Sequence, residues 1–221
     1  MINVAIDGPA GAGKSTVAKA AAKALGFIYV DTGALYRTVA LAAQRAGVLS
    51  DKEGIIALLD KITVELKYID GVQAVFLDGE DVSALIRTPE ISMGASSASA
   101  IPEVRAFLLD LQRDIAKRNN VVMDGRDIGT VVLPDAGLKI FLTASAEARA
   151  RRRYIELQQK GDPATFEEVL ADMLVRDKND STRDAAPLKA ADDAIPVDTT
   201  DMTLEESIDF LCGLIRERFG L

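Results

Sequence analysis

The segment GPAGAGKS, residues 8–15, fits the phosphate-binding pattern G-x-x-x-x-G-K-[ST] at every position. The apolar run Ile2–Asp7 before it predicts a buried strand, and the Ala- and Lys-rich segment Lys14–Leu25 after it predicts a helix. A strand that runs through a glycine-rich loop into a helix is typical of parallel α/β folds. The loop, here called the P-loop, directs several backbone N–H groups and the positive end of the helix dipole at one point, where an anion binds.

The residues of the P-loop have distinct expected roles toward a nucleotide. Lys14 brings a positive charge to the β- and γ-phosphates, and Ser15 offers its hydroxyl to Mg²⁺. A glycine-rich turn with an incidental lysine is the alternative, which the flanking strand and helix disfavour. The pattern predicts ATP or GTP binding, but kinases, ATPases and switch GTPases all carry it. The expected nucleotide-binding residues are Gly8, Pro9, Ala10, Gly11, Ala12, Gly13, Lys14, Ser15 and Thr16.

The order of the remaining segments predicts a parallel sheet with helices on both faces. Residues 62–82 alternate apolar and polar side chains, which indicates a small antiparallel insert. Strands are expected at Ile2–Asp7, Phe27–Val30, Asn120–Asp124, Leu138–Leu142 and Ile195–Asp198. Helices are expected at Lys14–Leu25, Ala34–Ala46, Ala146–Gln159, from Pro102 onward, from Phe166 to about Lys178, and along the apolar stripe Leu204, Ile208, Leu211 and Ile215.

The composition removes several kinds of chemistry. The 221 residues are enough for one hydrophobic core, and they include no histidine, no tryptophan and a single cysteine, Cys212. Catalytic Ser-His-Asp or Cys-His systems, His-ligated zinc or haem, four-cysteine metal sites and an intrachain disulfide are therefore excluded. Cys212 lies beside the last apolar stripe, so we interpret it as a packing residue. An enzyme of this composition works mainly by positioning and charge.

The charge balance and hydropathy bear on partners and location. The formal net charge of −8 disfavours general nucleic-acid binding, whereas the arginine run at 149–153 suits a small anion. No segment approaches the roughly 18 apolar residues of a membrane-spanning helix. The N-terminus lacks the basic region of a signal peptide. We therefore expect a cytoplasmic protein that binds neither nucleic acid nor membrane, and a monomer, since no apolar helix face is left unexplained.

Two further segments resemble anion sites. Thr32 and Arg37 flank the start of the helix after the second strand, where phosphate binds readily, although a turn with a helix cap is the alternative. The string Asp124–Asp127 follows an apolar strand, and the carboxyl ends of parallel strands face the ligand crevice. Asp124 is expected to hold the hydration shell of Mg²⁺ and Arg126 to bind a phosphate. A helix-capping loop is the alternative for this string.

Arg176, Asp180 and Arg183 have i, i+4, i+7 spacing, which places them on one face of a helix. A surface ion-pair cluster explains such a set equally well when it is taken alone. Beside a P-loop and the charged helix 146–159, we favour a mobile lid that closes arginine onto the transferred phosphoryl group and excludes water.

Several motifs together resemble those of bacterial cytidylate kinases. They are GPAGAGKST, DTGALYR, GEDVSALIR, DGRDIG and the RD…R…APL stretch, and the resemblance covers about residues 2–210. It implies transfer of the γ-phosphoryl group of ATP to CMP or dCMP. It also implies one α/β domain over residues 1–221 with the three-layer P-loop NTPase fold and a five-stranded parallel sheet. Within it, the core comprises residues 1–32, 106–145 and 185–221. The monophosphate-binding part is 33–105, with an antiparallel insert at about 62–87, and a short helical lid is 146–184.

The resemblance also implies roles for individual residues. It places Lys14, Arg126 and Arg176 at the transferred phosphoryl group and Arg149 and Arg153 at ATP. The implied contacts of the acceptor phosphate are Thr32, Arg37, Arg87, Gly125 and Arg126. The implied contacts of the cytosine are Ser96, Arg105 and Asp127, and those of the pentose and phosphate are Arg176, Asp180 and Arg183.

The implied cytosine site has a physical rationale. A carboxylate such as Asp127 accepts from the N4 amino group of cytosine, and an arginine such as Arg105 donates to N3 or O2. Uracil presents O4 and N3–H at these places, so both pairings fail and buried groups stay unpaired. The acceptor phosphate is largely ionised at neutral pH and is its own nucleophile, so no general base is expected.

Other assignments predict different features. Another P-loop small-molecule kinase, for UMP, AMP or shikimate, is the nearest alternative, and a panel of acceptors separates these. A GTPase switch needs an N-K-x-D motif after a late strand, but the nearest string, residues 177–180, reads DKND and lies in an expected helix. A nucleic-acid-dependent ATPase is disfavoured by the net acidity.

Overall fold

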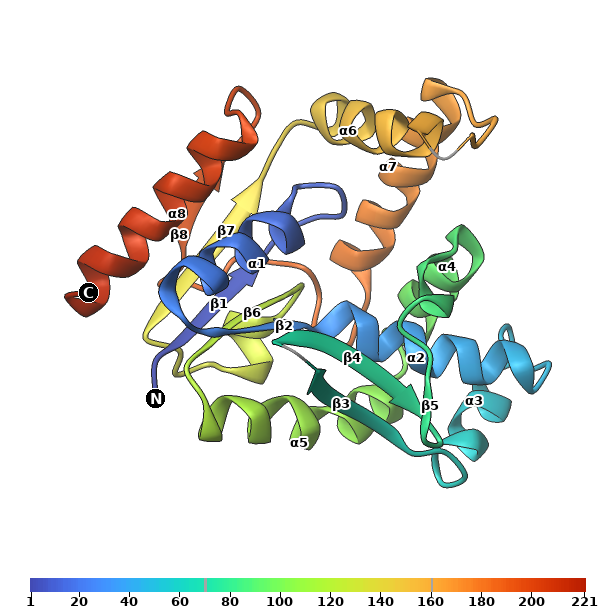
Figure 1. Ribbon diagram of the computed structural model, residues 1–221. Coiled ribbons are helices and arrows are strands. Elements are labelled where there is room, and N and C mark those ends of the chain that lie inside the picture. The colour runs from blue at the N-terminus through green and yellow to red at the C-terminus, as the bar shows by residue number, and fades with distance from the viewer. Residues whose placement is uncertain (70, 160) are drawn as a thin grey trace.

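The computed structural model describes residues 1–69, 71–159 and 161–221, and it confirms the predicted parallel sheet (Figure 1). Five parallel strands lie in the order β2-β6-β1-β7-β8. The strands are β1 (Asn3–Asp7), β2 (Ile28–Asp31), β6 (Val121–Gly125), β7 (Leu138–Thr143) and β8 (Ile195–Asp198). Each lies within one residue of its predicted bounds, because short apolar runs ended by polar or turn residues mark buried strands clearly.

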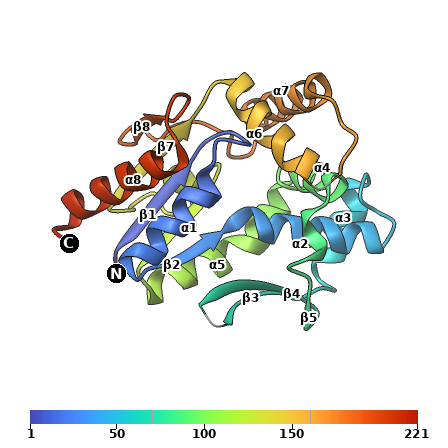
Figure 2. The ribbon, with the colours of Figure 1, turned by 45° about the horizontal axis from the view of Figure 1, so that its top comes forward.

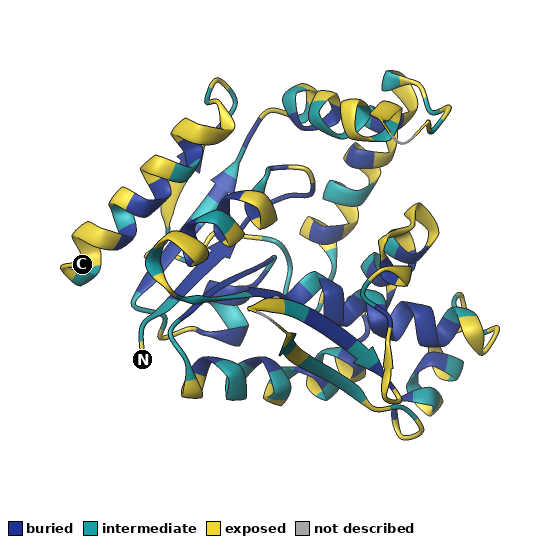
Figure 3. Cartoon of the chain, in the orientation of Figure 1, coloured by how far each residue is buried: buried dark blue, intermediate teal, exposed yellow. Residues whose placement is uncertain are grey.

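Alternate residues of β1 show how helices cover both faces of this sheet. Val4 and Ile6 pack with α1 (Lys14–Leu25) and α8 (Leu204–Phe219), whereas Ala5 packs with residues of α5 (Pro102–Arg118). Strands β1, β6 and β7 are almost entirely buried, the edge strand β8 exposes all of its residues but Val197, and α1 and α8 expose only their outer sides (Figure 3). Cys212 is buried in the α1–α8 cluster, as its position beside the apolar stripe predicted.

The antiparallel insert is confirmed as a separate sheet of β3 (Val64–Ile69), β4 (Val72–Leu77) and β5 (Glu80–Asp81), in that order. It packs on α2 (Thr32–Arg45), and a single apolar cluster joins them to α3 (Lys52–Leu59) and α4 (Pro89–Ala98) (Figure 2). Neither α3 nor α4 was expected from the sequence. For α4 the signal was present: Thr88 caps the helix by accepting from the backbone N–H of Ile91, and Pro89 occupies its first turn.

Helices α6 (Ala146–Gln159) and α7 (Phe166–Thr182) form an arm at the same end of the molecule as the P-loop (Figure 1). They share a small apolar cluster of Ala150, Val169 and Met173. The capping box of Thr165 and Glu168 starts α7 as predicted. However, α7 continues to Thr182, past the predicted end near Lys178, and Arg183 is its extended C-cap. Within the described residues, no helix is long and apolar enough to cross a bilayer.

Candidate active site

A cavity of about 700 Å³ opens where β1, β2 and β6 end. This edge is where ligands bind in parallel α/β sheets. The cavity collects residues from the P-loop, α2, α4, α5, α6 and α7. Among the predicted site residues, those that line it are Ala10, Gly11, Ala12, Gly13, Lys14, Ser15, Thr16, Thr32, Arg37, Arg87, Ser96, Arg105, Gly125, Arg126, Asp127, Arg153, Arg176, Asp180 and Arg183. Gly8, Pro9 and Arg149 lie outside its lining.

The P-loop backbone passes very close to the end of β7. Gly8 has a φ of 149°, and a Cβ added there would lie 1.9 Å from the carbonyl oxygen of Leu142, so only glycine fits. Lys14 starts α1 after Gly13, and its buried ammonium donates to the carbonyl oxygen of Pro9 at 2.7 Å. Burial, followed by the positive charge of Arg126, lowers the pKa of Lys14 well below its usual value. A nearby anion would stabilise the charged ammonium and so offset the cost of burying it.

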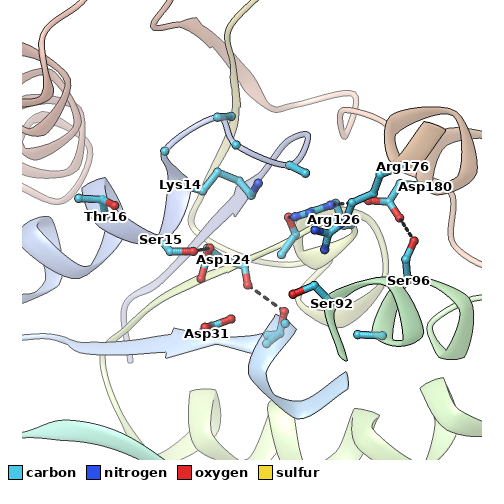
Figure 4. A pocket seen from close by; sticks show the side chains of 18 of the residues that line it. Lys14, Ser15, Thr16, Asp31, Ser92, Ser96, Asp124, Arg126, Arg176 and Asp180 are labelled. Carbon is cyan, nitrogen blue, oxygen red and sulfur yellow. Dashed lines mark hydrogen bonds and ion pairs between the residues drawn. The ribbon is translucent and has the colours of Figure 1, made fainter. Parts of the chain in front are cut away.

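Asp124, at the end of β6, lies opposite Ser15 (Figure 4). The Ser15 hydroxyl donates to Asp124 Oδ2 at 2.8 Å, and the Tyr29 hydroxyl donates to Oδ1 at 3.0 Å. Burial, with the negative charge of Asp31, raises the pKa of Asp124 to about 6. A buried carboxylate beside a hydroxyl is a hard-oxygen donor set that fits Mg²⁺, which takes one or two protein ligands and completes its shell with phosphates and water.

Thr32 and Arg37 lie on the first turns of α2, facing the P-loop. Asp31 caps this helix by accepting from the backbone N–H of Ala34 at 3.0 Å, and it pairs with Arg37 at 2.8 Å. Thr32 donates its hydroxyl hydrogen to the carbonyl oxygen of Asp124 at 2.8 Å. Arg37 Nε is buried and has no hydrogen-bond partner among the described residues. A donor left free in this place is suited to an incoming anion.

Two further arginines face Lys14 across the cavity (Figure 4). Arg126 donates from Nε to Asp180 at 2.8 Å, and Ser96 donates to the other oxygen of that carboxylate at 3.1 Å. Arg176 lies beside them, and burial with the charge of Arg126 lowers its pKa to about 10. Burial raises the pKa of Asp180, but the charges of Arg126 and Arg176 outweigh it and hold that pKa below its usual value. The positive charge gathered here is only partly neutralised by carboxylates.

Asp127 is held between two arginines that line the same cavity. Arg105 forms an ion pair with one oxygen of this buried carboxylate, and Arg183 Nη2 lies 3.8 Å from the other. Ser99 accepts from both arginines, through its carbonyl oxygen for Arg105 at 3.2 Å and its hydroxyl for Arg183 at 2.7 Å. The Arg105 guanidinium also lies 5.5 Å from the ring centre of Tyr36. This part of the cavity offers a carboxylate acceptor and planar donors side by side.

The arginine run of α6 divides into different environments. Arg149 is buried and donates to the carbonyl oxygens of Ala10, at 2.8 Å, and Ala144, at 2.9 Å. It also pairs with Asp177 of α7 at 2.6 Å. Arg153 lines the cavity and pairs with Glu156 at 3.0 Å.

Arg152 also lines the cavity but was not among the predicted site residues. Its guanidinium donates to the carbonyl oxygen of Thr199 at 2.6 Å. Consecutive charged residues on a helix give no signal for which of them faces a ligand, so the sequence could not separate it from its neighbours. Other lining residues absent from the prediction include Asp31, Tyr36, Ser92, Ser99 and Thr199. Ser99 had one weak signal, because it lies three residues after Ser96. This spacing places the two serines on one side of a helix only if α4 is recognised.

Comparisons with known proteins identify the family of this chain. The family model described as "Cytidylate kinase" matches residues 4–217. The chain is 55% identical over 217 residues to a cytidylate kinase from Caldanaerobacter subterraneus, which covers 98% of this chain and 95% of the relative. It is 50% identical over 220 residues to one from Caldicellulosiruptor saccharolyticus, with 99% and 97% covered.

Among solved structures, an uncharacterized protein from Eubacterium ventriosum superposes with a TM-score of 0.51 at 13% identity over 98% of both chains, which bears on the fold alone. Half of all positions are shared with the curated relatives over nearly their full length. The chain therefore belongs to the cytidylate kinase family of phosphotransferases, which phosphorylate a nucleoside monophosphate with ATP.

Proposed function

We propose that this chain phosphorylates CMP and dCMP in preference to other monophosphates, by direct in-line transfer from ATP with Mg²⁺. One observation carries the base preference: Asp127 is held beside Arg105 and Arg183 in the cavity that the P-loop also lines. The carboxylate is the acceptor that the N4 amino group of cytosine requires, and the guanidinium groups are the donors that N3 and O2 require. Uracil offers the opposite polarity at the first two of these positions.

The transfer is a single displacement. An oxygen of the CMP phosphate forms a bond to the γ-phosphorus of ATP, the bond from that phosphorus to the β–γ bridging oxygen breaks, and ADP leaves. Lys14, Arg126 and Arg176 line the same cavity, where they would stabilise the charge on the transferred group. Thr32, Arg37, Arg87 and the backbone at Gly125 hold the acceptor phosphate.

Ser15 and Asp124 are the residues that would hold Mg²⁺, which supplies charge neutralisation at the β- and γ-phosphates. Ser15, which donates to Asp124 here, would turn its hydroxyl oxygen to the cation. Tyr29 keeps the carboxylate oriented by donating to its other oxygen. This buried carboxylate has hydroxyl donors but no ion-pair partner among the described residues, which supports the assignment.

We further propose that residues 146–184 act as a lid, 33–105 as the monophosphate-binding part and the remainder as the core. The separate apolar cluster of α6 and α7 supports a lid that moves as a unit. Arg153 faces the cavity from this arm and is the better placed of the predicted ATP contacts. Ser96, Asp180 and Arg183 complete the nucleoside site. A monomeric state and a cytoplasmic location stay predictions.

A panel of acceptors tests the base preference. Steady-state ADP formation is measured with CMP, dCMP, UMP and AMP at equal ATP and Mg²⁺. We expect the highest kcat/KM for CMP and dCMP, and a loss of activity on chelating Mg²⁺. A better kcat/KM for UMP or AMP would contradict the proposal.

A further inference from the structure

The outer edge of β2 is hydrogen-bonded by side chains of the antiparallel insert. Strand β2 lies at the end of the five-stranded sheet, so one edge of it has no strand partner in that sheet. The amide of Gln73 accepts from the backbone N–H of Asp31 at 2.8 Å and donates to its carbonyl oxygen at 3.2 Å. The Tyr68 hydroxyl donates to the carbonyl oxygen of Tyr29 at 3.0 Å. Side chains thus take the place of a neighbouring strand.

These contacts come from one face of the insert. Tyr68 on β3 and Gln73 on β4 are directly opposite each other in the antiparallel register, so their side chains project to the same side. They reach residues two apart on β2, whose backbone groups face the same edge. A single amide that satisfies both backbone groups of Asp31 fixes that residue more narrowly than one hydrogen bond would. Neither side chain is among the residues that line the cavity.

The residue fixed in this way controls the start of α2. Asp31 caps α2 and pairs with Arg37 at 2.8 Å through its carboxylate. Thr32 is the next residue, and its hydroxyl reaches the carbonyl oxygen of Asp124 at 2.8 Å. A shift of the Asp31 backbone therefore moves both groups that face the acceptor phosphate. Among the described residues, Gln73 itself hydrogen-bonds Asp31 and no residue of the P-loop, and the chain of contacts ends at the Asp124 backbone carbonyl.

We propose that Gln73 is a positioning residue for the acceptor nucleotide, and that Tyr68 supports it two residues earlier on β2. The insert thereby sets the affinity for the acceptor from outside the cavity. This inference rests on the proposed function, because it takes Thr32 and Arg37 as contacts of the CMP phosphate.

The test separates the KM for CMP from the KM for ATP. Gln73→Met removes both amide contacts and keeps the length of the side chain. Since the two neutral hydrogen bonds together contribute about 1–3 kcal/mol, we expect the KM for CMP to rise by about 5- to 150-fold. The KM for ATP should stay near its wild-type value. Tyr68→Phe, which removes only the hydroxyl, should raise the KM for CMP in the same direction by a smaller factor.

Two further variants distinguish positioning from general damage to the insert. Lys67→Met is the matched control, because it introduces the same methionine into the same sheet. The ammonium of Lys67 contacts only Glu65 and Phe76 of the insert among the described residues, so this variant should leave both KM values unchanged. Gln73→Glu keeps the acceptor for the Asp31 N–H but sets a carboxylate oxygen against the Asp31 carbonyl oxygen. It should raise the KM for CMP at least as much as Gln73→Met does.

The outcomes are distinct. A wild-type chain that fails to phosphorylate CMP contradicts the proposed function itself. With an active wild type, three results each contradict the role of Gln73. The first is an equal rise of the KM for CMP and the KM for ATP in Gln73→Met, and the second is an unchanged KM for CMP in that variant. The third is a wild-type KM for CMP in Gln73→Glu. Thermal unfolding of each variant shows whether the fold is retained, and a KM split in a folded variant supports the inference.

Discussion

At the scale of single residues, this site depends on charged groups that are buried before any ligand binds. Lys14, Asp124 and Asp127 are all nearly inaccessible to solvent. Isolated charges in such places are strongly disfavoured, so each must be compensated by a partner or by a ligand. Asp127 has its partners in the chain, whereas Lys14 and Asp124 have pKa values shifted toward their neutral forms. A nucleotide phosphate would compensate the charge of Lys14, and its bound cation would compensate the charge of Asp124.

Asp127→Asn tests the base preference at this scale. The amide keeps the size of the carboxylate but presents a donor where cytosine presents its N4 donor, while the O4 acceptor of uracil becomes compatible. We expect kcat/KM for CMP to fall by about 100-fold or more, since a mismatched buried polar contact is heavily penalised. The ratio of UMP to CMP activity should rise. The measurement is kcat/KM for both acceptors, together with the KM for ATP.

The KM for ATP is the internal control for this variant. If it rises as much as the KM for CMP, Asp127 acts on the whole cavity and not on the base. Asp127→Ala is less informative, because it leaves Arg105 and Arg183 facing each other without the shared carboxylate.

At the scale of elements, the Arg149 side chain joins the P-loop to the helical arm. The guanidinium of Arg149 in α6 binds the carbonyl oxygen of Ala10 in the P-loop and the carboxylate of Asp177 in α7. The resemblance to the family places Arg149 at ATP, but here its donors are directed into the protein. Its position in this structure suits a connection between elements more than a nucleotide contact.

Arg149→Met distinguishes these two roles. If the side chain connects the elements, the variant loses hydrogen bonds of a charged donor and leaves Asp177 partly buried and unpaired. The nucleotide-free protein should then be less stable by about 2–4 kcal/mol, discounted because Asp177 is partly exposed. Denaturant unfolding without nucleotide measures this. A variant with wild-type stability and a raised KM for ATP would instead support a direct ATP contact. Arg151→Met, at an exposed position of the same helix, is the matched control.

Secondary structure was predictable wherever its cause is local. The bounds of α1 and the capping box of α7 follow from residues a few positions apart. The π-helical turn at Ile128–Val132 had no such signal. It follows Asp127, and the carboxylate of Asp7 accepts from the backbone N–H groups of Ile128 and Gly129 at 2.7 Å each. That support comes from β1, more than a hundred residues away in the chain.

At the scale of the whole molecule, the buried carboxylates at the ends of β1 and β6 make stability depend on pH. Burial raises the pKa of both Asp7 and Asp124 to about 6, against 3.8 for an ordinary Asp. The folded chain therefore binds more protons than the unfolded chain between these values. The contribution of both groups to the free energy of unfolding thus falls as pH rises from about 4 to 6.

Asp124→Asn should remove one of these penalties. We expect the variant to be more stable than the wild type by about 1–3 kcal/mol near neutral pH, and the gain to shrink toward about pH 4, where the wild-type carboxyl is protonated. It should also be nearly inactive. Exposed carboxyls with lowered pKa values, such as Asp193, instead stabilise the folded chain as pH rises. The quantity to follow is therefore the difference in the free energy of unfolding between the variant and the wild type.

Denaturant unfolding at several pH values makes this measurement, with the exposed Asp110→Asn as the matched control. A gain that is constant with pH, or a loss at neutral pH, would contradict the argument. The expected result is a protein that becomes more stable when a functional group is removed, which is the usual consequence of a charge buried for function.

The sequence alone determined the strand–loop–helix that binds phosphate, the parallel sheet, the antiparallel insert and the family, because these depend on short-range sterics, periodicity and motif spacing. It also predicted that the P-loop, the start of α2 and residues 125–127 meet at one cavity, since they follow strands whose carboxyl ends lie at one edge.

Only the tertiary structure decided which side chains meet. It turned Arg149 inward and Arg152 and Arg153 toward the cavity, and it placed Gln73 against Asp31. Such contacts depend on how elements that are distant in the sequence pack together. A rotation of a helix about its axis by one residue position gives each of its side chains a different partner. No local pattern encodes that rotation, because it results from the packing of the whole core.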